Sequence, residues 1–240
     1  MLKAGAGRVS RPPIYERVVR EGQKPHALFL TCADSRIDPE LLTQSGPGEI
    51  FVCRNIGNLA PAYGEMLGGI SAVIEYAVTA LQVSQVVVCG HTDCGAVKGL
   101  LHPEPLSAMP TVKSWLRNAE AALSVVQARN TAPDESAALR ELIDENVVLQ
   151  MSHLRTRPSV AGRLARGILA VSGWVYDIAT VMCMSTMNSA GSSSRRKIRL
   201  RPWTAVRVRQ NDLAQGPQPG QDVALMLGVP SPCCWRTTSP

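Results

Sequence analysis

Short apolar segments alternate with helical patterns along most of the chain. Three of them, at residues 27–31, 50–53 and 85–89, have the continuous apolar character of a buried strand. A fourth segment, residues 168–178, has the β-branched and aromatic content of a strand. Apolar runs of this length between turn residues predict buried strands. Because these strands alternate with helices, the pattern predicts an α/β fold built on a mostly parallel sheet.

The segments between the strands carry apolar residues at helical spacing. A short helix is predicted over about 14–21 and a longer one over 65–82. Two amphipathic helices follow, with apolar stripes over 112–126 and 139–154. A further helix is expected to begin at Pro158, since proline is favoured in the first turn.

The composition is typical of one globular domain with a possible appendage. The chain has 240 residues, of which 45% are hydrophobic, and this is enough for one sizeable core. No apolar run reaches the roughly 18 residues of a membrane span, and residues 1–13 lack the apolar stretch of a secretory signal. The seven cysteines form no regular framework, so reduced thiols and a cytoplasmic location are expected.

The positive charge is concentrated near the C-terminus. The formal net charge is +6, and residues 178–240, with eight basic and two acidic residues, account for all of it. A neutral body predicts no nucleic-acid partner, and no membrane partner is expected either. The alternative is that the basic segment from Arg195 to Arg209 binds phosphates non-specifically.

Chemically reactive side chains follow two of the predicted strands. Cys32 comes directly after the first and His91 after the third, with Cys94 three residues later. Sites in open α/β sheets form at the carboxyl ends of strands, so these side chains are expected to approach one point. Two thiolates and one imidazole suit zinc, and three protein ligands leave a fourth position open, as in catalytic sites. Either motif alone would more often be a packing feature. Their combination predicts a metal centre.

An acidic and a basic residue accompany the first cysteine. Asp34 lies two residues after Cys32, and Arg36 lies two residues after Asp34. This spacing lets a carboxylate point toward the metal while a guanidinium binds it in a bidentate manner. By itself such a pair would be a surface ion pair of little energetic value. Beside a zinc site it predicts a positioned hydrogen-bond acceptor for a metal-bound water.

Other residues are predicted to have structural roles. The backbone near the cleft is expected to be shaped by Asn55, Gly57 and Gly69. The histidines without ligand spacing are His26, His102 and His153. Core or interface positions, rather than a substrate pocket, are expected for Phe29, Val52, Tyr76 and Leu81. Cys53 and Cys89 lie inside strands and are expected to be structural.

Four motifs follow one another in a specific order. They read CADSR at 32–36, RNIGN at 54–58, GGISAVIEYAV at 68–78 and VVCGHTDCGA at 87–96. Together with the later LRTRPSV and GWVYDI segments, they closely resemble the β-class carbonic anhydrases over about residues 20–178. The resemblance implies that one Zn²⁺ per chain is bound by Cys32, His91 and Cys94, with Asp34 and Arg36 as the catalytic dyad. It also implies four parallel strands with an antiparallel edge strand, flanked by helices, and a homodimer or higher homo-oligomer.

The activity implied by this resemblance is the reversible hydration of carbon dioxide to bicarbonate by a zinc-dependent lyase, a carbonate dehydratase. Zinc would lower the pKa of its bound water toward about 7, and the resulting hydroxide would attack carbon dioxide. Asp34 would accept a hydrogen bond from this hydroxide while Arg36 holds the carboxylate. The alternative is a zinc-binding member of the family that is impaired in catalysis.

Both ends of the chain depart from the family pattern. The N-terminal arm, residues 1–22, is short, and the zinc-dependent domain is expected to span 23–178. The family continues with a turn and a strand, whereas residues 179–240 are basic and have a composition that predicts disorder. One extra base before the codon of Val181 restores valines and aromatic residues at the expected strand. We therefore hypothesise a frame shift near residue 180, which makes the tail an out-of-frame translation.

Overall fold

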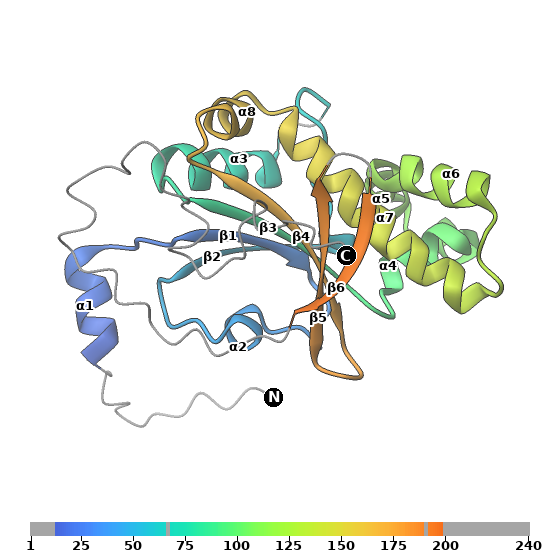
Figure 1. Cartoon of the computed structure of the whole chain (residues 1–240), viewed down its shortest axis with the longest axis horizontal. Coiled ribbons are helices and arrows are strands. Elements are labelled where there is room, and N and C mark those ends of the chain that lie inside the picture. Colours follow the sequence, from blue (N-terminus) through green and yellow to red (C-terminus); the bar gives the residue numbers. More distant parts are fainter. Residues whose placement is uncertain (1–12, 66–67, 190–191, 199–240) are drawn as a thin grey trace, which may run out of the picture. The chain divides into compact units, whose positions relative to one another are not determined.

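The computed structural model describes the backbone of residues 13–65, 68–189 and 192–198. Within these residues, six strands form one sheet in the order β2-β1-β3-β4-β5-β6 (Figure 1). The strands are β1 Ala27–Cys32, β2 Ile50–Asn55, β3 Gln85–His91, β4 Ala170–Asp177, β5 Met182–Ser189 and β6 Ser192–Ile198. The first four are parallel, whereas β5 and β6 are antiparallel to their neighbours. The predicted α/β fold, with four parallel strands and an antiparallel edge, is confirmed, and β6 is an additional strand.

Helices connect the parallel strands. They are α1 Pro13–Glu21, α2 Pro39–Thr43, η1 Ile56–Asn58, α3 Gly69–Glu75, η2 Tyr76–Ala80, α4 Gly95–Leu101, η3 Glu104–Ala108, α5 Pro110–Leu116, η4 Arg117–Ala119, α6 Glu120–Arg129, α7 Glu135–Arg155 and α8 Pro158–Ala165. No helix among the described residues combines the length and the apolar character needed to span a membrane.

Two predicted helices differ from the structure in detail. The helix expected over 65–82 begins at Gly69, and its second half, η2, is a π-helix. The apolar stripe over 112–126 is divided among α5, η4 and α6. At this break, Asn118 Nδ2 donates a hydrogen bond of 2.8 Å to the carbonyl of Trp115. Asparagine side chains that bond to nearby backbone in this way compete with continued helix formation.

The largest part of the core lies between the sheet and α7. Side chains alternate along β1, so that Leu28 and Leu30 face the helical side and Phe29 faces the other. On the helical side they belong to one cluster with the α7 residues Leu142, Ile143, Val147, Met151 and Leu154. On the other side Phe29 makes an edge-to-face contact with Trp174, with ring centroids 5.9 Å apart. Burial on both faces explains why β1 and β3 are continuous apolar runs.

Gly90 in β3 marks a close approach between the sheet and α7. A Cβ atom on this residue would lie 2.8 Å from Val147 Cγ2 and 3.5 Å from Ile143 Cγ2. Because both neighbours are buried and stiff at χ1, Gly90→Ala is expected to lower the free energy of unfolding by about 1–3 kcal/mol. Urea denaturation measures this change. The control is Gly162→Ala in α8, where no atom of the described residues lies within 4 Å of the added Cβ and the substitution favours the helix. Equal destabilisation by both substitutions would contradict the packing argument.

Two strands, β5 and β6, lie in the segment after residue 179, whose composition predicts disorder. The backbone of β5 pairs with β4, with Cys183 opposite Tyr176, and β6 pairs with β5. Composition does not reveal this pairing, because it uses backbone N–H and C=O groups. β5 stands where the restored reading frame predicts a strand, and the frame shift stays a hypothesis. Residues 1–12 and 199–240 lie outside the described part, so the division into arm, domain and tail stays a prediction.

Candidate metal centre

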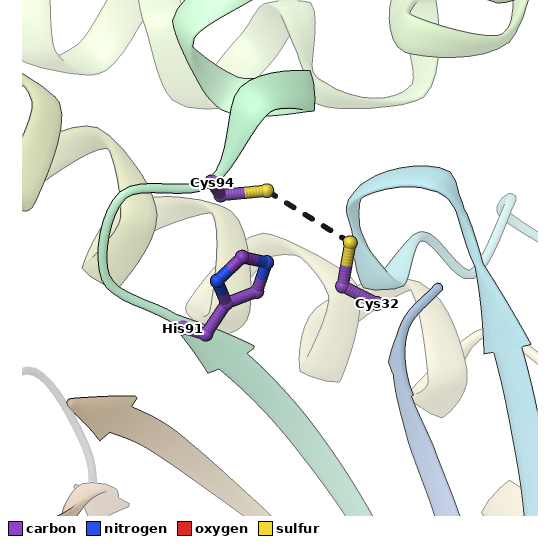
Figure 2. A group of neighbouring side chains, drawn as sticks. All are labelled: Cys32, His91 and Cys94. Carbon is purple, nitrogen blue, oxygen red and sulfur yellow. Dashed lines mark hydrogen bonds between the residues drawn. The ribbon is translucent and has the colours of Figure 1, made fainter. Parts of the chain in front are cut away.

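The three predicted ligands meet at the carboxyl edge of the sheet. Cys32 is the last residue of β1 and His91 the last of β3, and these neighbouring parallel strands end at the same edge. Cys94 follows His91 after a tight turn in which Asp93 has a positive φ of 59°. Figure 2 shows the two sulfur atoms directed toward one another, with the imidazole ring beside them.

The distances fit a shared metal ion. The ligand atoms of Cys32, His91 and Cys94 all lie within 4.8 Å of one another, and all three residues are buried. The two Sγ atoms are 4.0 Å apart. Two sulfurs bound to one tetrahedral zinc at about 2.3 Å would be about 3.8 Å apart. The three side chains can therefore share an ion without movement of the backbone.

The imidazole of His91 is oriented as a metal ligand requires. Nδ1 lies 2.8 Å from the carbonyl oxygen of Thr92. Because a carbonyl can only accept, Nδ1 carries the proton and Nε2 presents its lone pair. Nε2 is buried and has no hydrogen-bond partner among the residues that the structure describes. A buried polar atom without a partner is costly, and a metal ion between Nε2 and the two sulfurs would satisfy it.

The pKa values of the two thiols are shifted in opposite directions. The pKa of Cys32 is lowered, chiefly by the hydrogen bond with Cys94 and further by the backbone N–H groups of Gly57 and Asp34. The pKa of Cys94 is raised, first by the neighbouring Cys32 sulfur and then by burial. The contact between the two sulfurs therefore favours ionisation of Cys32 over that of Cys94. A metal that binds both sulfurs must displace any proton that they hold.

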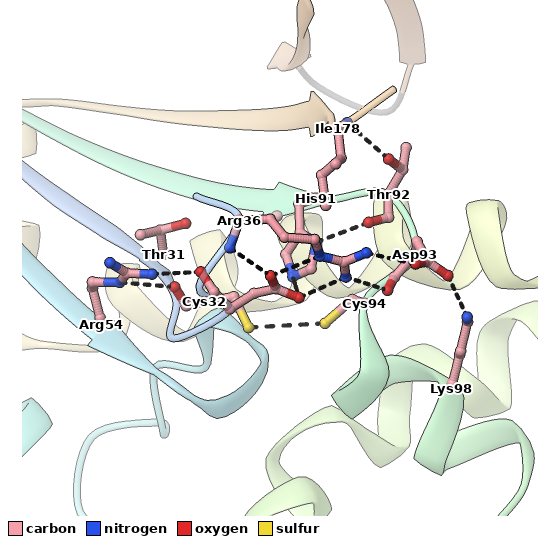
Figure 3. Close-up of polar contacts among 12 residues, drawn as sticks. Thr31, Cys32, Arg36, Arg54, His91, Thr92, Asp93, Cys94, Lys98 and Ile178 are labelled. Atoms are coloured by element: carbon pink, nitrogen blue, oxygen red, sulfur yellow. Dashed lines mark hydrogen bonds and ion pairs between the residues drawn. The ribbon is translucent and has the colours of Figure 1, made fainter. Parts of the chain in front are cut away.

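Arg36 lies beside Cys32, His91 and Cys94 (Figure 3) and makes a bidentate ion pair with Asp34. Arg36 Nε donates to Asp34 Oδ1 at 2.9 Å, and Arg36 Nη2 donates to Oδ2 at 2.7 Å. These hydrogen bonds hold the pKa of Asp34 well below its usual range, so the carboxylate is charged and can only accept. Its Oδ2 lies 3.9 Å from His91 Nε2. The ion pair therefore directs one carboxylate oxygen toward Nε2 of His91.

Two polar residues near the dyad were not singled out by sequence reasoning. Asp93 accepts a hydrogen bond of 2.8 Å from Arg36 Nη1 and also pairs with Lys98. Arg54 donates to the backbone carbonyls of Cys32 and Asp34. The only sequence signal for Asp93 is its place between His91 and Cys94. Arg54 stands opposite Thr31 in the β1–β2 register, which only the sheet reveals.

The remaining predicted residues lie outside this cluster or support it. Asn55 binds both backbone groups of Leu59, and Gly57 has a φ of 78°. His102 pairs with Glu135, and His153 Nδ1 lies 3.0 Å from the carbonyl of Ala60.

The other predicted structural residues lie in or near the core. Burial raises the pKa of Cys53 to about 11, and the neighbouring Cys183 raises the pKa of Cys89. Phe29 is in the core, whereas Tyr76 is half exposed and contacts Phe51, with ring centroids 6.0 Å apart.

Comparisons with known proteins agree on one family. The sequence profile of the family described as "Carbonic anhydrase" matches residues 27–183. A carbonic anhydrase of Pseudomonas aeruginosa is 46% identical over 202 residues, which cover 84% of this chain and 87% of that protein. A carbonic anhydrase of Synechococcus elongatus is 46% identical over 170 residues, and the match covers 70% of this chain and 62% of that longer protein.

Solved structures give the same result. The β-carbonic anhydrase CcaA is 39% identical with a TM-score of 0.71, and the match covers 74% of this chain and 86% of that one. A structure described as one of two tetrameric β-carbonic anhydrases from Sordaria macrospora is 27% identical with a TM-score of 0.65. That match covers 74% of this chain and 89% of the fungal chain.

Proposed function

Because this chain belongs to the β class of the carbonic anhydrase family, we propose that Cys32, His91 and Cys94 hold one zinc ion and that Asp34 and Arg36 form the catalytic dyad. The family reaction is the reversible hydration of carbon dioxide to bicarbonate, and the chain is a zinc lyase of this kind. The observation that carries the ligand assignment is the side chain of His91. Its buried Nε2 has no hydrogen-bond partner in the described part of the chain, and its ligand nitrogen lies within 4.8 Å of both sulfurs.

The chemistry that zinc supplies when bound is a lowered pKa of coordinated water, which provides a nucleophile at neutral pH. The residues of the chain position this nucleophile. Asp34 is ionised, and its Oδ2 would accept a hydrogen bond from the coordinated water and so orient the oxygen that attacks carbon dioxide. Arg36 fixes the carboxylate through two hydrogen bonds of 2.9 and 2.7 Å and a third of 3.0 Å from its backbone N–H. The carboxylate therefore keeps its direction throughout the reaction.

We also propose that the chain acts as a homodimer or higher homo-oligomer. The description of the fungal neighbour as tetrameric supports this proposal. Ile56, Tyr63 and Tyr76 are each about half exposed, and they give the described surface apolar groups that a second copy could cover.

Stopped-flow measurement of carbon dioxide hydration, together with the zinc content of the purified chain, tests this function. We expect about one zinc per chain, as a site with three protein ligands and one open position would bind, and hydration well above the uncatalysed rate. Zinc without activity would favour the alternative of a catalytically impaired member of the family. A folded chain that takes up no zinc would overturn the ligand assignment.

A further inference from the structure

Two buried amides interrupt the apolar core face of α7. Asn146 and Gln150 are 1% and 0% exposed, in a helix that otherwise buries mainly aliphatic side chains here. They lie one turn apart, and Gln150 Nε2 donates a hydrogen bond of 2.9 Å to Asn146 Oδ1. Burying an amide is costly unless its polar atoms are paired. A pair of buried amides in the core therefore indicates that they bind polar groups of another segment of the chain.

That partner is the segment that follows β2. Asn146 Nδ2 donates to the carbonyl of Gly57 at 3.1 Å, and Gln150 Oε1 accepts from the backbone N–H of Ala60 at 2.9 Å. Gln150 Nε2 also donates to the carbonyl of Asn118 at 3.1 Å. Because Gln150 binds Asn146 Oδ1, the amide of Asn146 is held with its Nδ2 facing Gly57.

Gly57 connects this network to the metal centre. The segment that contains it is joined to the end of β1 by the Ala33 N–H, which donates to the Asn55 carbonyl at 2.8 Å. The backbone N–H of Gly57 helps to lower the pKa of the Cys32 thiol. The φ of 78° at Gly57 favours glycine, and a Cβ atom here would lie 3.3 Å from the Cβ of Ala96, at the start of α4. Gly57 is therefore confined between the end of β1 and the helix that follows Cys94. Its position depends on the amide that holds its carbonyl.

We propose that Asn146 is a positioning residue for the metal centre: by holding the Gly57 carbonyl, it keeps the Gly57 N–H against Cys32 Sγ. Gln150 orients the Asn146 amide. Hydrogen bonds of this kind fix the direction of a ligand and its electron donation, and their loss typically lowers metal affinity about 10- to 100-fold. The inference rests on the proposed zinc ligation and adds a residue to it.

The test compares Asn146→Leu with Thr156→Val in the full chain. Thr156 Oγ1 accepts from the backbone N–H of Tyr63 at 2.9 Å. The control therefore loosens the same loop without touching Gly57. Zinc affinity is measured by competition with a chelator, and the environment of the sulfurs by the thiolate-to-cobalt absorption of the Co²⁺-substituted protein. We expect Asn146→Leu to lower zinc affinity about 10- to 100-fold and to shift the cobalt band, while Thr156→Val leaves both nearly unchanged.

A second variant separates positioning from folding. Asn146→Ser keeps a polar group, but the serine side chain is too short to reach the Gly57 carbonyl. This variant should therefore also lower zinc affinity and shift the cobalt band. Circular dichroism of the zinc-free variants identifies those that fold. Unchanged zinc affinity in a folded Asn146 variant, or an equal loss in Thr156→Val, would overturn this inference and leave the proposed function intact. Absence of zinc binding by the unsubstituted chain would instead overturn the ligand assignment on which the inference rests.

Discussion

Replacing Cys94 with alanine is expected to abolish zinc binding and carbon dioxide hydration together. The side chain is 1% exposed, and its sulfur lies 4.0 Å from that of Cys32. Without it, two protein ligands remain, one fewer than catalytic zinc sites use. Since water without a metal has a pKa of 15.7 rather than about 7, activity should fall by at least about three orders of magnitude. Zinc analysis and stopped-flow hydration of the same preparation measure both effects.

A matched control for this substitution is Cys53→Ala. Cys53 is also a buried cysteine near the end of a parallel strand, but it does not belong to the metal-binding group. This substitution should cost some stability through a small cavity and leave zinc content and activity close to their original values. Retention of zinc by the Cys94 variant, or loss of zinc by both variants, would contradict the assignment of Cys94 as a ligand.

The sequence was sufficient to place the three residues of the centre, because local pattern and topology agree there. Cys32 and His91 each follow an apolar run bounded by turn residues, and such runs identify buried parallel strands. Parallel neighbours end at the same edge, so residues 59 positions apart in the chain were predicted to meet. The contact between Asp34 and Arg36 could be predicted for a different reason. It is local and depends only on a spacing of two residues.

The hydrogen bonds that surround the centre could not be predicted from strand pattern and local spacing. The hydrogen bond from Asn146 to Gly57 joins residues 89 positions apart, and Asn146 lies within an amphipathic pattern that indicates only a helix. The contact between Asp93 and Arg36 spans 57 positions. Neither contact leaves a periodic signal, because each depends on which side chains two separate elements bring together. The backbone pairing of β5 was hidden for a similar reason, since it depends on the neighbouring β4 rather than on composition.

The second large effect is expected from Asp34→Asn, which preserves the size of the side chain and removes its charge. One carboxylate oxygen becomes an NH₂ group that cannot accept from Arg36, so at least one of the two hydrogen bonds of 2.9 and 2.7 Å is lost. Groups that hold or transfer a proton in the reaction typically contribute about 10²- to 10⁴-fold. We therefore expect the turnover number to fall at least about 100-fold while zinc content is retained, because Asp34 is not among the predicted ligands.

The informative comparison for this prediction is Asp93→Asn. Asp93 binds the same guanidinium at 2.8 Å, but its side chain is 53% exposed. Exposed ion pairs contribute little to stability, and Arg36 keeps its two side-chain hydrogen bonds to Asp34 in this variant. Turnover should therefore change by less than about threefold. If both substitutions reduced turnover equally, the position of Arg36 rather than the Asp34 oxygen would limit the reaction. A large loss confined to Asp34→Asn, with zinc still bound, is the result that a carboxylate orienting the nucleophile requires.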